Sequence, residues 1–202
     1  FELDASIMEG KDLSAGAVAG LKHVKHPINA AYAVKTKSPH VMLSGAGAEE
    51  FAKEQGLEMV EDNMYFATPK TMEWIEKLKQ ESKKNGTVGC VVLDKQGNLT
   101  AGTSTGGMFK KRWGRIGDSP VIGAGTYADN NSCAVSCTGH GEYFIRHAVA
   151  FDVCARYKYL KESVEKAADY IIHTELNTNA GNGGLIAVDK LGNIAMPYNS
   201  GG

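Results

Sequence analysis

Residues 87–105 predict a β-hairpin, and this hairpin constrains the fold more than any other feature of the 202-residue chain. Two runs rich in β-branched and apolar residues, Thr87–Leu93 and Leu99–Thr105, flank a short polar segment that contains a glycine. Strand-forming runs around such a segment are typical of a hairpin. If residues 95–97 form the loop, with the glycine in the left-handed conformation, Thr87 lies directly opposite Thr105. Opposed residues hold their Cβ atoms about 4.5–5.5 Å apart, so one hydroxyl can polarise the other.

The junction Gly86-Thr87 is a candidate site of self-cleavage. A lysine-rich polar segment, residues 80–85, ends there and the strand-forming run begins. If the bond is cut, Thr87 gains an α-amino group, whose ordinary pKa of about 7.7–8.0 suits a general base for the residue's own hydroxyl. The junction therefore predicts a self-processing hydrolase. Two simpler interpretations stay open: an ordinary strand start with a threonine pair that only stabilises the sheet, and a two-residue loop that places Gly106 opposite Thr87.

Several sequence strings occur in the order typical of one enzyme family. They are G-T-V-G-C-V (86–91), T-S-T-G-G (103–107), G-R-I-G-D-S-P-V-I-G-A-G-T-Y-A (114–128) and S-C-T-G-H-G-E (136–142), with D-A-S-I-M-E-G (4–10) upstream and G-G-L-I-A-V-D (183–189) downstream. With these strings the chain resembles the plant-type L-asparaginases and isoaspartyl peptidases, which are N-terminal-nucleophile hydrolases. The resemblance implies an α/β fold, a four-layer αββα sandwich with helices outside two central sheets.

The resemblance also implies roles for residues around the cleavage site. Cleavage between Gly86 and Thr87 would make Thr87 the nucleophile, with Thr105 orienting or activating it. Thr138 and Gly139 would form the oxyanion hole through a hydroxyl and a backbone N–H, donors that stabilise a tetrahedral intermediate.

Three further residues would bind the substrate if the resemblance holds. The planar guanidinium of Arg115 would bind an α-carboxylate, Asp118 would receive the α-ammonium, and the carbonyl of Gly141 would be a second acceptor. Arg115 and Asp118 also admit a simpler interpretation, a surface ion pair worth about 0–1 kcal/mol. His140 is interpreted as a residue that lines the pocket rather than a general base.

The implied reaction releases L-aspartate from β-aspartyl dipeptides and from the side-chain amide of L-asparagine. A glycosylasparaginase, acting on N-acetylglucosaminyl-asparagine, is the alternative enzyme, although Gly86 stands where that branch usually carries an acidic residue. A truncated or unprocessed precursor without catalysis is the third hypothesis. No cofactor is expected, and the resemblance suggests a dimer of αβ units.

The cleavage site divides the chain into residues 1–86, a partial α-subunit, and residues 87–202, a β-subunit segment; together they form one domain. The chain opens at Phe1–Asp4 as if within a strand, so a family segment with a first core strand and a sodium-binding loop is expected to be missing.

Composition excludes several classes of partner. The net charge is −1 and 43% of residues are hydrophobic, so neither nucleic acid nor an anionic membrane is indicated, and no run reaches the about 20 apolar residues that span a bilayer. The basic run Lys110–Arg112 is interpreted as a solvated loop flank. Cys133 and Cys137 are about 13 Å apart on a strand, too far to bridge. Cys90 and Cys154 are interpreted as core residues, which makes the cytoplasm the expected compartment.

The remaining periodicities predict alternating helices and strands. Helices are expected at 27–37, 46–55, 143–157 and 163–172. A further helix is expected to begin at Thr68-Pro69 and to continue through Met72, Ile75 and Leu78. Strands are expected at 41–43, 121–125 and 134–138, with a second hairpin across 189–193.

Overall fold

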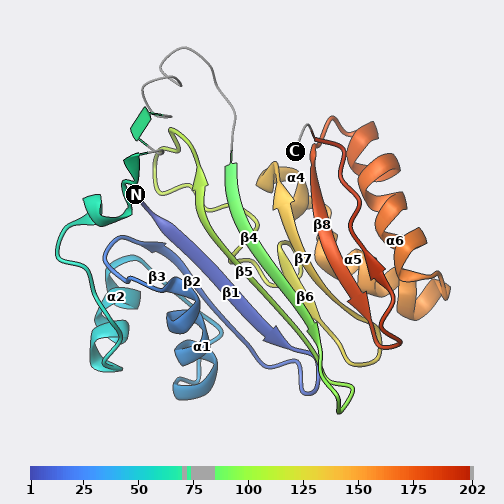
Figure 1. Ribbon diagram of the computed structural model, residues 1–202, viewed down its shortest axis with the longest axis horizontal. Coiled ribbons are helices and arrows are strands. Elements are labelled where there is room, and N and C mark those ends of the chain that lie inside the picture. The colour runs from blue at the N-terminus through green and yellow to red at the C-terminus, as the bar shows by residue number, and fades with distance from the viewer. Residues whose placement is uncertain (70–71, 74–84, 201–202) are drawn as a thin grey trace.

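The computed structural model describes residues 1–69, 72–73 and 85–200. Its first sheet has the order β3-β2-β1-β5-β4 and contains elements from both sides of the Gly86-Thr87 junction (Figure 1). The strands are β1 (Leu3–Glu9), β2 (Ala15–Leu21), β3 (Met42–Ser44), β4 (Asn85–Leu93) and β5 (Leu99–Met108). Helices α1 (Pro27–Lys37) and α2 (Gly45–Glu54) cover its outer face.

The second sheet comes from the C-terminal half of the chain and has the order β6-β7-β8-β9. Its strands are β6 (Thr126–Ala128), β7 (Cys133–Gly139), β8 (Gly183–Asp189) and β9 (Ile194–Ala195). Helices α4 (Gly141–Arg146), α5 (Val149–Ala155) and α6 (Val164–Tyr170) belong to this half, and α5 and α6 pack on the outer face of the sheet. Short 3-10 or π segments occupy Asn63–Phe66, Arg156–Leu160 and Ile171–Leu176.

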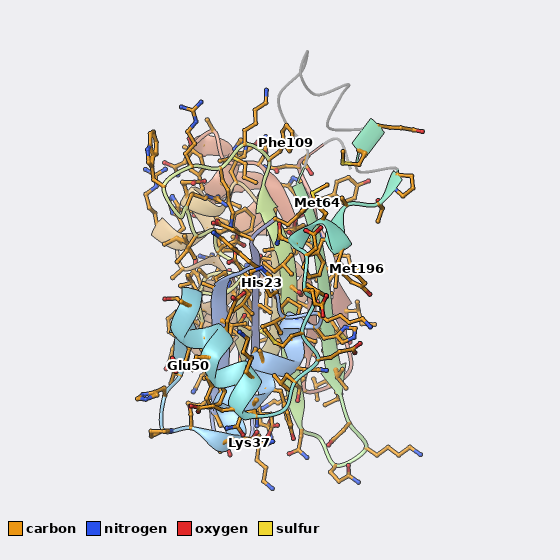
Figure 2. All side chains as sticks on the ribbon, turned by 90° about the vertical axis from the view of Figure 1, so that its left-hand side faces the viewer. His23, Lys37, Glu50, Met64, Phe109 and Met196 are labelled. Atoms are coloured by element: carbon orange, nitrogen blue, oxygen red, sulfur yellow. The ribbon has the colours of Figure 1, made fainter. Side chains whose placement is uncertain are left out.

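Three apolar clusters fill the spaces between these layers. One lies between α1, α2 and the first sheet, and one between the second sheet and α5 and α6. The third contains Leu99 and Ala101 of β5 with Ala134 and Val188 of the second sheet, so it joins the two sheets. The predicted αββα sandwich is therefore confirmed. Figure 2 shows the α1 and α2 side of the molecule, with Phe109 at the end opposite Lys37.

The first hairpin has the predicted register. Thr87 pairs with Thr105, and Leu93 pairs with Leu99. Gly97 has φ +83°, a left-handed conformation that costs glycine little. The carboxylate of Asp94 accepts the N–H groups of Gln96 at 2.8 Å and Asn98 at 2.7 Å, which fixes the turn. The odd-numbered residues of β5 from 99 to 105 are buried, so they face the second sheet.

Several predicted elements agree with the structure in position. Helix α1 begins at Pro27 as expected, because proline has the helical φ and needs no N–H partner at the first position. Ser163 caps α6 by accepting the N–H of Lys166 at 3.2 Å. The strand at 134–138 lies within β7, and the hairpin across 189–193 joins β8 to β9. Most of the helix expected after Thr68-Pro69 lies outside the described residues.

Three predictions about helices, strands and core cysteines were wrong. The helix expected over 143–157 is two helices, because Ala148 has φ +46° and breaks the ladder between them. Residues 121–125 form turns closed by hydrogen bonds such as Ala124 N–H to the Val121 carbonyl at 3.0 Å, and the strand begins only at Thr126. Cys90 is exposed rather than buried in a core, whereas Cys154 is buried.

Candidate active site

The hydroxyl of Thr105 lies at the centre of a hydrogen-bonded group at the start of β4. Thr87 Oγ1 donates to Thr105 Oγ1 over 3.2 Å. Thr105 Oγ1 in turn donates to the carbonyl oxygen of Gly86 at 3.0 Å, and it accepts the backbone N–H of Gly107 at 3.0 Å. The predicted threonine pair thus contacts the carbonyl of the peptide bond that precedes Thr87. A hydroxyl donor on that oxygen polarises the carbonyl toward attack.

The ends of β4 and β7 that carry Thr87 and Thr138 lie on the same side of the molecule. The two strands come from different sheets and approach closely at Gly89, where a Cβ atom would stand 2.3 Å from Ser136 Oγ. In Figure 1, β4 descends from its start and β7 rises to its end, so the start of β4, near Thr87, and the end of β7, near Thr138, lie toward the same edge. Thr138 is exposed there. A Cβ on the next residue, Gly139, would stand 2.4 Å from the Asn182 carbonyl oxygen.

Arg115, Asp118 and Gly141 converge at the start of α4. A Cβ on Gly141 would lie 2.8 Å from Arg115 Nη2 and 2.9 Å from Asp118 Oδ1, so both side chains contact the glycine backbone closely. Asp118 is 5% exposed, and within the described part of the chain its Oδ2 has no hydrogen-bond partner. Burial raises the pKa of Asp118 to about 6, against the opposing pull of the Arg115 charge.

Glu142 is a site residue to which the sequence analysis assigned no role. Arg115 donates from Nε to Glu142 Oε1 at 2.9 Å and from Nη2 to Oε2 at 3.0 Å. These hydrogen bonds lower the pKa of the Glu142 carboxyl group. The interpretation of Arg115 and Asp118 as a plain surface ion pair is wrong, because the guanidinium binds Glu142 and Asp118 is buried. The one signal for Glu142 was its place in the string S-C-T-G-H-G-E.

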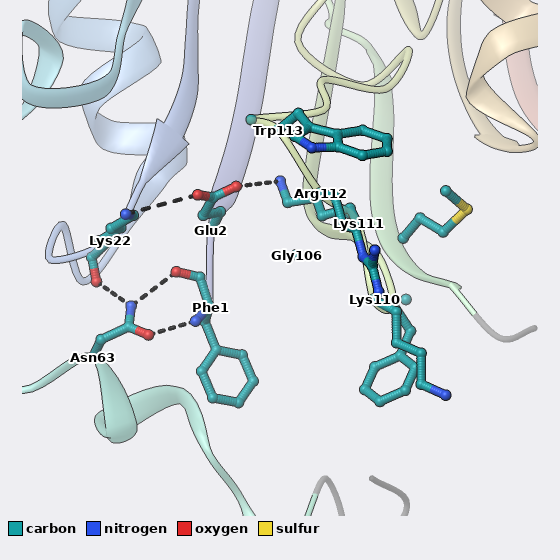
Figure 3. Close-up of a pocket in the computed structure, with 14 residues that line it drawn as sticks. Phe1, Glu2, Lys22, Asn63, Gly106, Lys110, Lys111, Arg112 and Trp113 are labelled. Carbon is teal, nitrogen blue, oxygen red and sulfur yellow. Dashed lines mark hydrogen bonds and ion pairs between the residues drawn. The ribbon is translucent and has the colours of Figure 1, made fainter. Parts of the chain in front are cut away.

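A cavity of about 760 Å³ opens beside the Gly86-Thr87 junction (Figure 3). Gly86 and Gly106 line it, together with residues of the basic run. The interpretation of that run as a solvated flank is wrong for Lys111, whose side chain is only 9% exposed. His140, interpreted as lining the pocket, is half-buried and stacks on Tyr143 with ring centroids 6.1 Å apart.

The Thr87 hydroxyl donates to Thr105, and Thr105 donates to the Gly86 carbonyl, at the edge between two sheets that helices cover. This arrangement is typical of an N-terminal-nucleophile hydrolase. The chain belongs to the asparaginase family, whose model matches residues 1–202. The resemblance stated from the sequence strings is therefore confirmed.

Relatives of the chain occur in bacteria and in eukaryotes. The isoaspartyl peptidase of Salmonella typhimurium is 48% identical, in a match that covers 100% of this chain and 68% of the relative. The isoaspartyl peptidase of Escherichia coli is 45% identical over 100% of this chain and 67% of the relative. The isoaspartyl peptidase/L-asparaginase of Mus musculus is 44% identical, covering 98% of this chain and 63% of the relative. Asparagine and isoaspartyl substrates fit this family. Within the described residues, no helix is long and apolar enough to cross a bilayer.

Proposed function

We propose that this chain is a self-processing threonine amidohydrolase that releases L-aspartate from β-aspartyl dipeptides and from L-asparagine. Two hydrogen bonds in series carry the proposal: the Thr87 hydroxyl donates to Thr105, and the Thr105 hydroxyl donates to the Gly86 carbonyl. The names of the relatives, isoaspartyl peptidase and isoaspartyl peptidase/L-asparaginase, support the substrate class.

Self-cleavage uses the groups already in contact. Thr87 Oγ1 attacks the Gly86 carbonyl carbon, the C–N bond breaks, and an ester joins Gly86 to the threonine oxygen while the nitrogen takes up the hydroxyl proton. Water then hydrolyses the ester, which leaves a carboxylate on Gly86 and a free α-amino group on Thr87. Thr105 assists because its hydroxyl donates to the carbonyl oxygen that gains negative charge.

The same hydroxyl then attacks the substrate. The α-amino group of Thr87 accepts the hydroxyl proton, the oxygen attacks the side-chain amide carbon, and the proton passes to the leaving nitrogen. Ammonia leaves from asparagine, and an amino acid leaves from a β-aspartyl dipeptide. The Thr138 hydroxyl and the Gly139 N–H stabilise the oxyanion, and water hydrolyses the aspartyl ester. Because the base belongs to the nucleophile, the reaction requires no cofactor.

Recognition of the substrate rests on opposite charges held close together. Asp118 Oδ2, which has no hydrogen-bond partner among the residues that the structure describes, accepts the α-ammonium of the substrate, with the Gly141 carbonyl as the second acceptor. Arg115 binds the α-carboxylate and shares its guanidinium with Glu142. A group that carries both charges on one carbon matches this arrangement, so the scissile amide is the one on the side chain.

Two further properties belong to the proposal. Pieces 1–86 and 87–202 form an αβ unit, and two such units form a dimer. The four cysteines among the described residues are free, which supports a reducing compartment such as the cytoplasm.

The test is the intact mass of the protein under denaturing conditions after prolonged incubation, in parallel with Thr87→Ala and Thr87→Ser. The parent chain should split between Gly86 and Thr87, the alanine variant should stay whole, and the serine variant should cleave because it keeps a hydroxyl. Cleaved protein should release aspartate from a β-aspartyl dipeptide. Release only from N-acetylglucosaminyl-asparagine would favour a glycosylasparaginase, and a parent chain that stays whole would support the precursor hypothesis.

A further inference from the structure

Lys111 is a buried cation beside the turn that holds the Thr105 hydroxyl, and the proposed mechanism gives it no role. Its Nζ lies 3.3 Å from Glu2 Oε2 and 3.8 Å from Asp4 Oδ2. Its side chain is 9% exposed, and in the part of the chain that the structure describes Nζ has no hydrogen-bond partner of good geometry. Figure 3 shows Lys111 reaching from the loop after β5 toward Glu2 at the start of β1.

Asp4 lies in the same row of the sheet as the two threonines. On β1 it pairs with Thr105 of β5, and Thr105 pairs with Thr87 of β4. Directly opposed residues point to the same face of a sheet, so all three side chains face the second sheet. Asp4 is fully buried. Its Oδ1 accepts the Gly20 N–H at 2.8 Å, while its Oδ2 has no hydrogen-bond partner among the described residues.

The stem of Lys111 also packs on the turn that holds the Thr105 hydroxyl. A Cβ on Gly107 would lie 3.1 Å from Lys111 Nζ and 3.2 Å from its Cδ. Gly107 has φ +72°, a left-handed conformation, and its N–H is the group that donates to Thr105 Oγ1 at 3.0 Å. A continuous set of contacts therefore leads from Asp4 through Lys111 and Gly107 to Thr105.

We propose that Lys111, held by Asp4 and Glu2, is a positioning residue that fixes the Gly107 N–H and thereby aims the Thr105 hydroxyl at the reacting carbonyl. This inference rests on the proposed function. A buried ion pair is a poor source of stability, since an apolar pair of similar size is often as stable. A pair that fixes one loop conformation beside a nucleophile instead serves the geometry of the reaction, where a 1 Å misplacement can cost about 100-fold in rate.

The first experiment compares Lys111→Met with Lys35→Met in the rate of cleavage between Gly86 and Thr87, measured by intact mass. Lys35 is a matched control, because its side chain is 7% exposed and pairs with Glu9 at 2.7 Å, at the other end of β1. We expect Lys111→Met to slow cleavage on the order of 10-fold or more. Lys35→Met should cleave at the parental rate, and thermal denaturation should show that both variants fold.

The second experiment separates positioning from folding. Lys111→Arg keeps the cation and should restore most of the rate. The double variant Asp4→Asn/Lys111→Met removes both buried charges, so it should fold even if Lys111→Met alone does not, and it should still cleave slowly. In protein that has cleaved, Lys111→Met should lower kcat with KM for a β-aspartyl dipeptide unchanged, because the side chains assigned to substrate binding remain.

The outcomes distinguish this inference from the proposed function. If the parent chain never cleaves, the proposed function fails and the inference fails with it. If the parent cleaves and either folded variant, Lys111→Met or the double variant, cleaves at the same rate, only the inference is overturned. A higher KM with unchanged kcat would also overturn it, because Lys111 would then act on substrate binding.

Discussion

At the scale of single residues, Gly141 is the clearest test of the substrate site. A methyl group there would stand 2.8 Å from Arg115 Nη2 and 2.9 Å from Asp118 Oδ1, so Gly141→Ala must displace both charged groups. We expect KM for a β-aspartyl dipeptide to rise about 10-fold, the loss of about 1.4 kcal/mol of binding, while self-cleavage continues. Steady-state kinetics check this. Gly47→Ala is the control, because a Cβ there meets no atom of the described residues within 4 Å; an unchanged KM in Gly141→Ala would contradict the assignment.

The buried carboxyl group of Asp118, which is assigned to substrate binding, should lower the stability of the folded protein at neutral pH. Its folded-state pKa of about 6 lies above the ordinary 3.8 because the carboxyl group is buried. The native state therefore holds a proton that the unfolded chain loses, and the unfolding free energy falls as pH rises from about 3.8 to about 6. The shift corresponds to about 3 kcal/mol.

Asp118→Asn should consequently be more stable than the parent by up to about 3 kcal/mol at pH 7, with the difference vanishing below pH 4. Urea denaturation at both pH values measures this, with Thr87→Ala in both proteins so that each remains one chain. The same substitution should abolish hydrolysis of a β-aspartyl dipeptide in protein that carries Thr87. Equal stability of the two proteins at pH 7 would show that Asp118 is ionised without penalty.

At the scale of elements, a chain of buried hydroxyl groups joins the two sheets below the site. Thr103 Oγ1 lies 2.6 Å from Ser136 Oγ and accepts from Thr126 Oγ1 at 2.5 Å, and Ser6 Oγ donates to Thr126 Oγ1 at 2.8 Å. All four residues are at most 3% exposed. This chain spans β1, β5, β6 and β7, so it fixes how the sheets stack where the site opens.

Thr103→Val should lower the unfolding free energy by about 1–3 kcal/mol, because it leaves buried hydroxyl groups without a partner. Thr100→Val, on the opposite and half-buried face of β5, should change stability by less. The midpoint and slope of urea unfolding measure both effects in the Thr87→Ala background. Equal losses in the two variants would mean that the buried hydroxyl chain contributes nothing specific.

The sequence predicts the structure best where local chemistry decides it. The hairpin register follows from the turn at Gly97 and the strand-forming runs beside it, so the Thr87–Thr105 contact was predictable. The break at Ala148 was not, because alanine favours helix and only packing imposes its φ of +46°. In the same way, the segment 121–125 reads as a strand, yet its N–H groups close turns.

At the scale of the whole molecule, the contacts that complete the site join residues that are far apart in the sequence. Lys111 is buried because Glu2 and Asp4 lie beside it in the fold, more than 100 positions away in the chain. Arg115 likewise binds Glu142, 27 residues away. The sequence of the basic run Lys110–Arg112 shows its charge but not the distant residues that pair with it. No local pattern therefore predicts that Lys111 is buried.

The pairing of strands in the first sheet indicates whether the two pieces stay together after cleavage. Strand β1 belongs to residues 1–86 and β5 to residues 87–202, and the two pair from Asp4 with Thr105 to Glu9 with Thr100. Cutting the Gly86–Thr87 bond breaks no rung of this ladder and removes no residue from the apolar clusters between the layers. The two pieces should therefore stay together in native buffer and elute in size exclusion at the volume of uncut Thr87→Ala. In urea above the unfolding midpoint they should separate into two species. Separation in native buffer would mean that the covalent link, rather than the shared sheet, holds the molecule together.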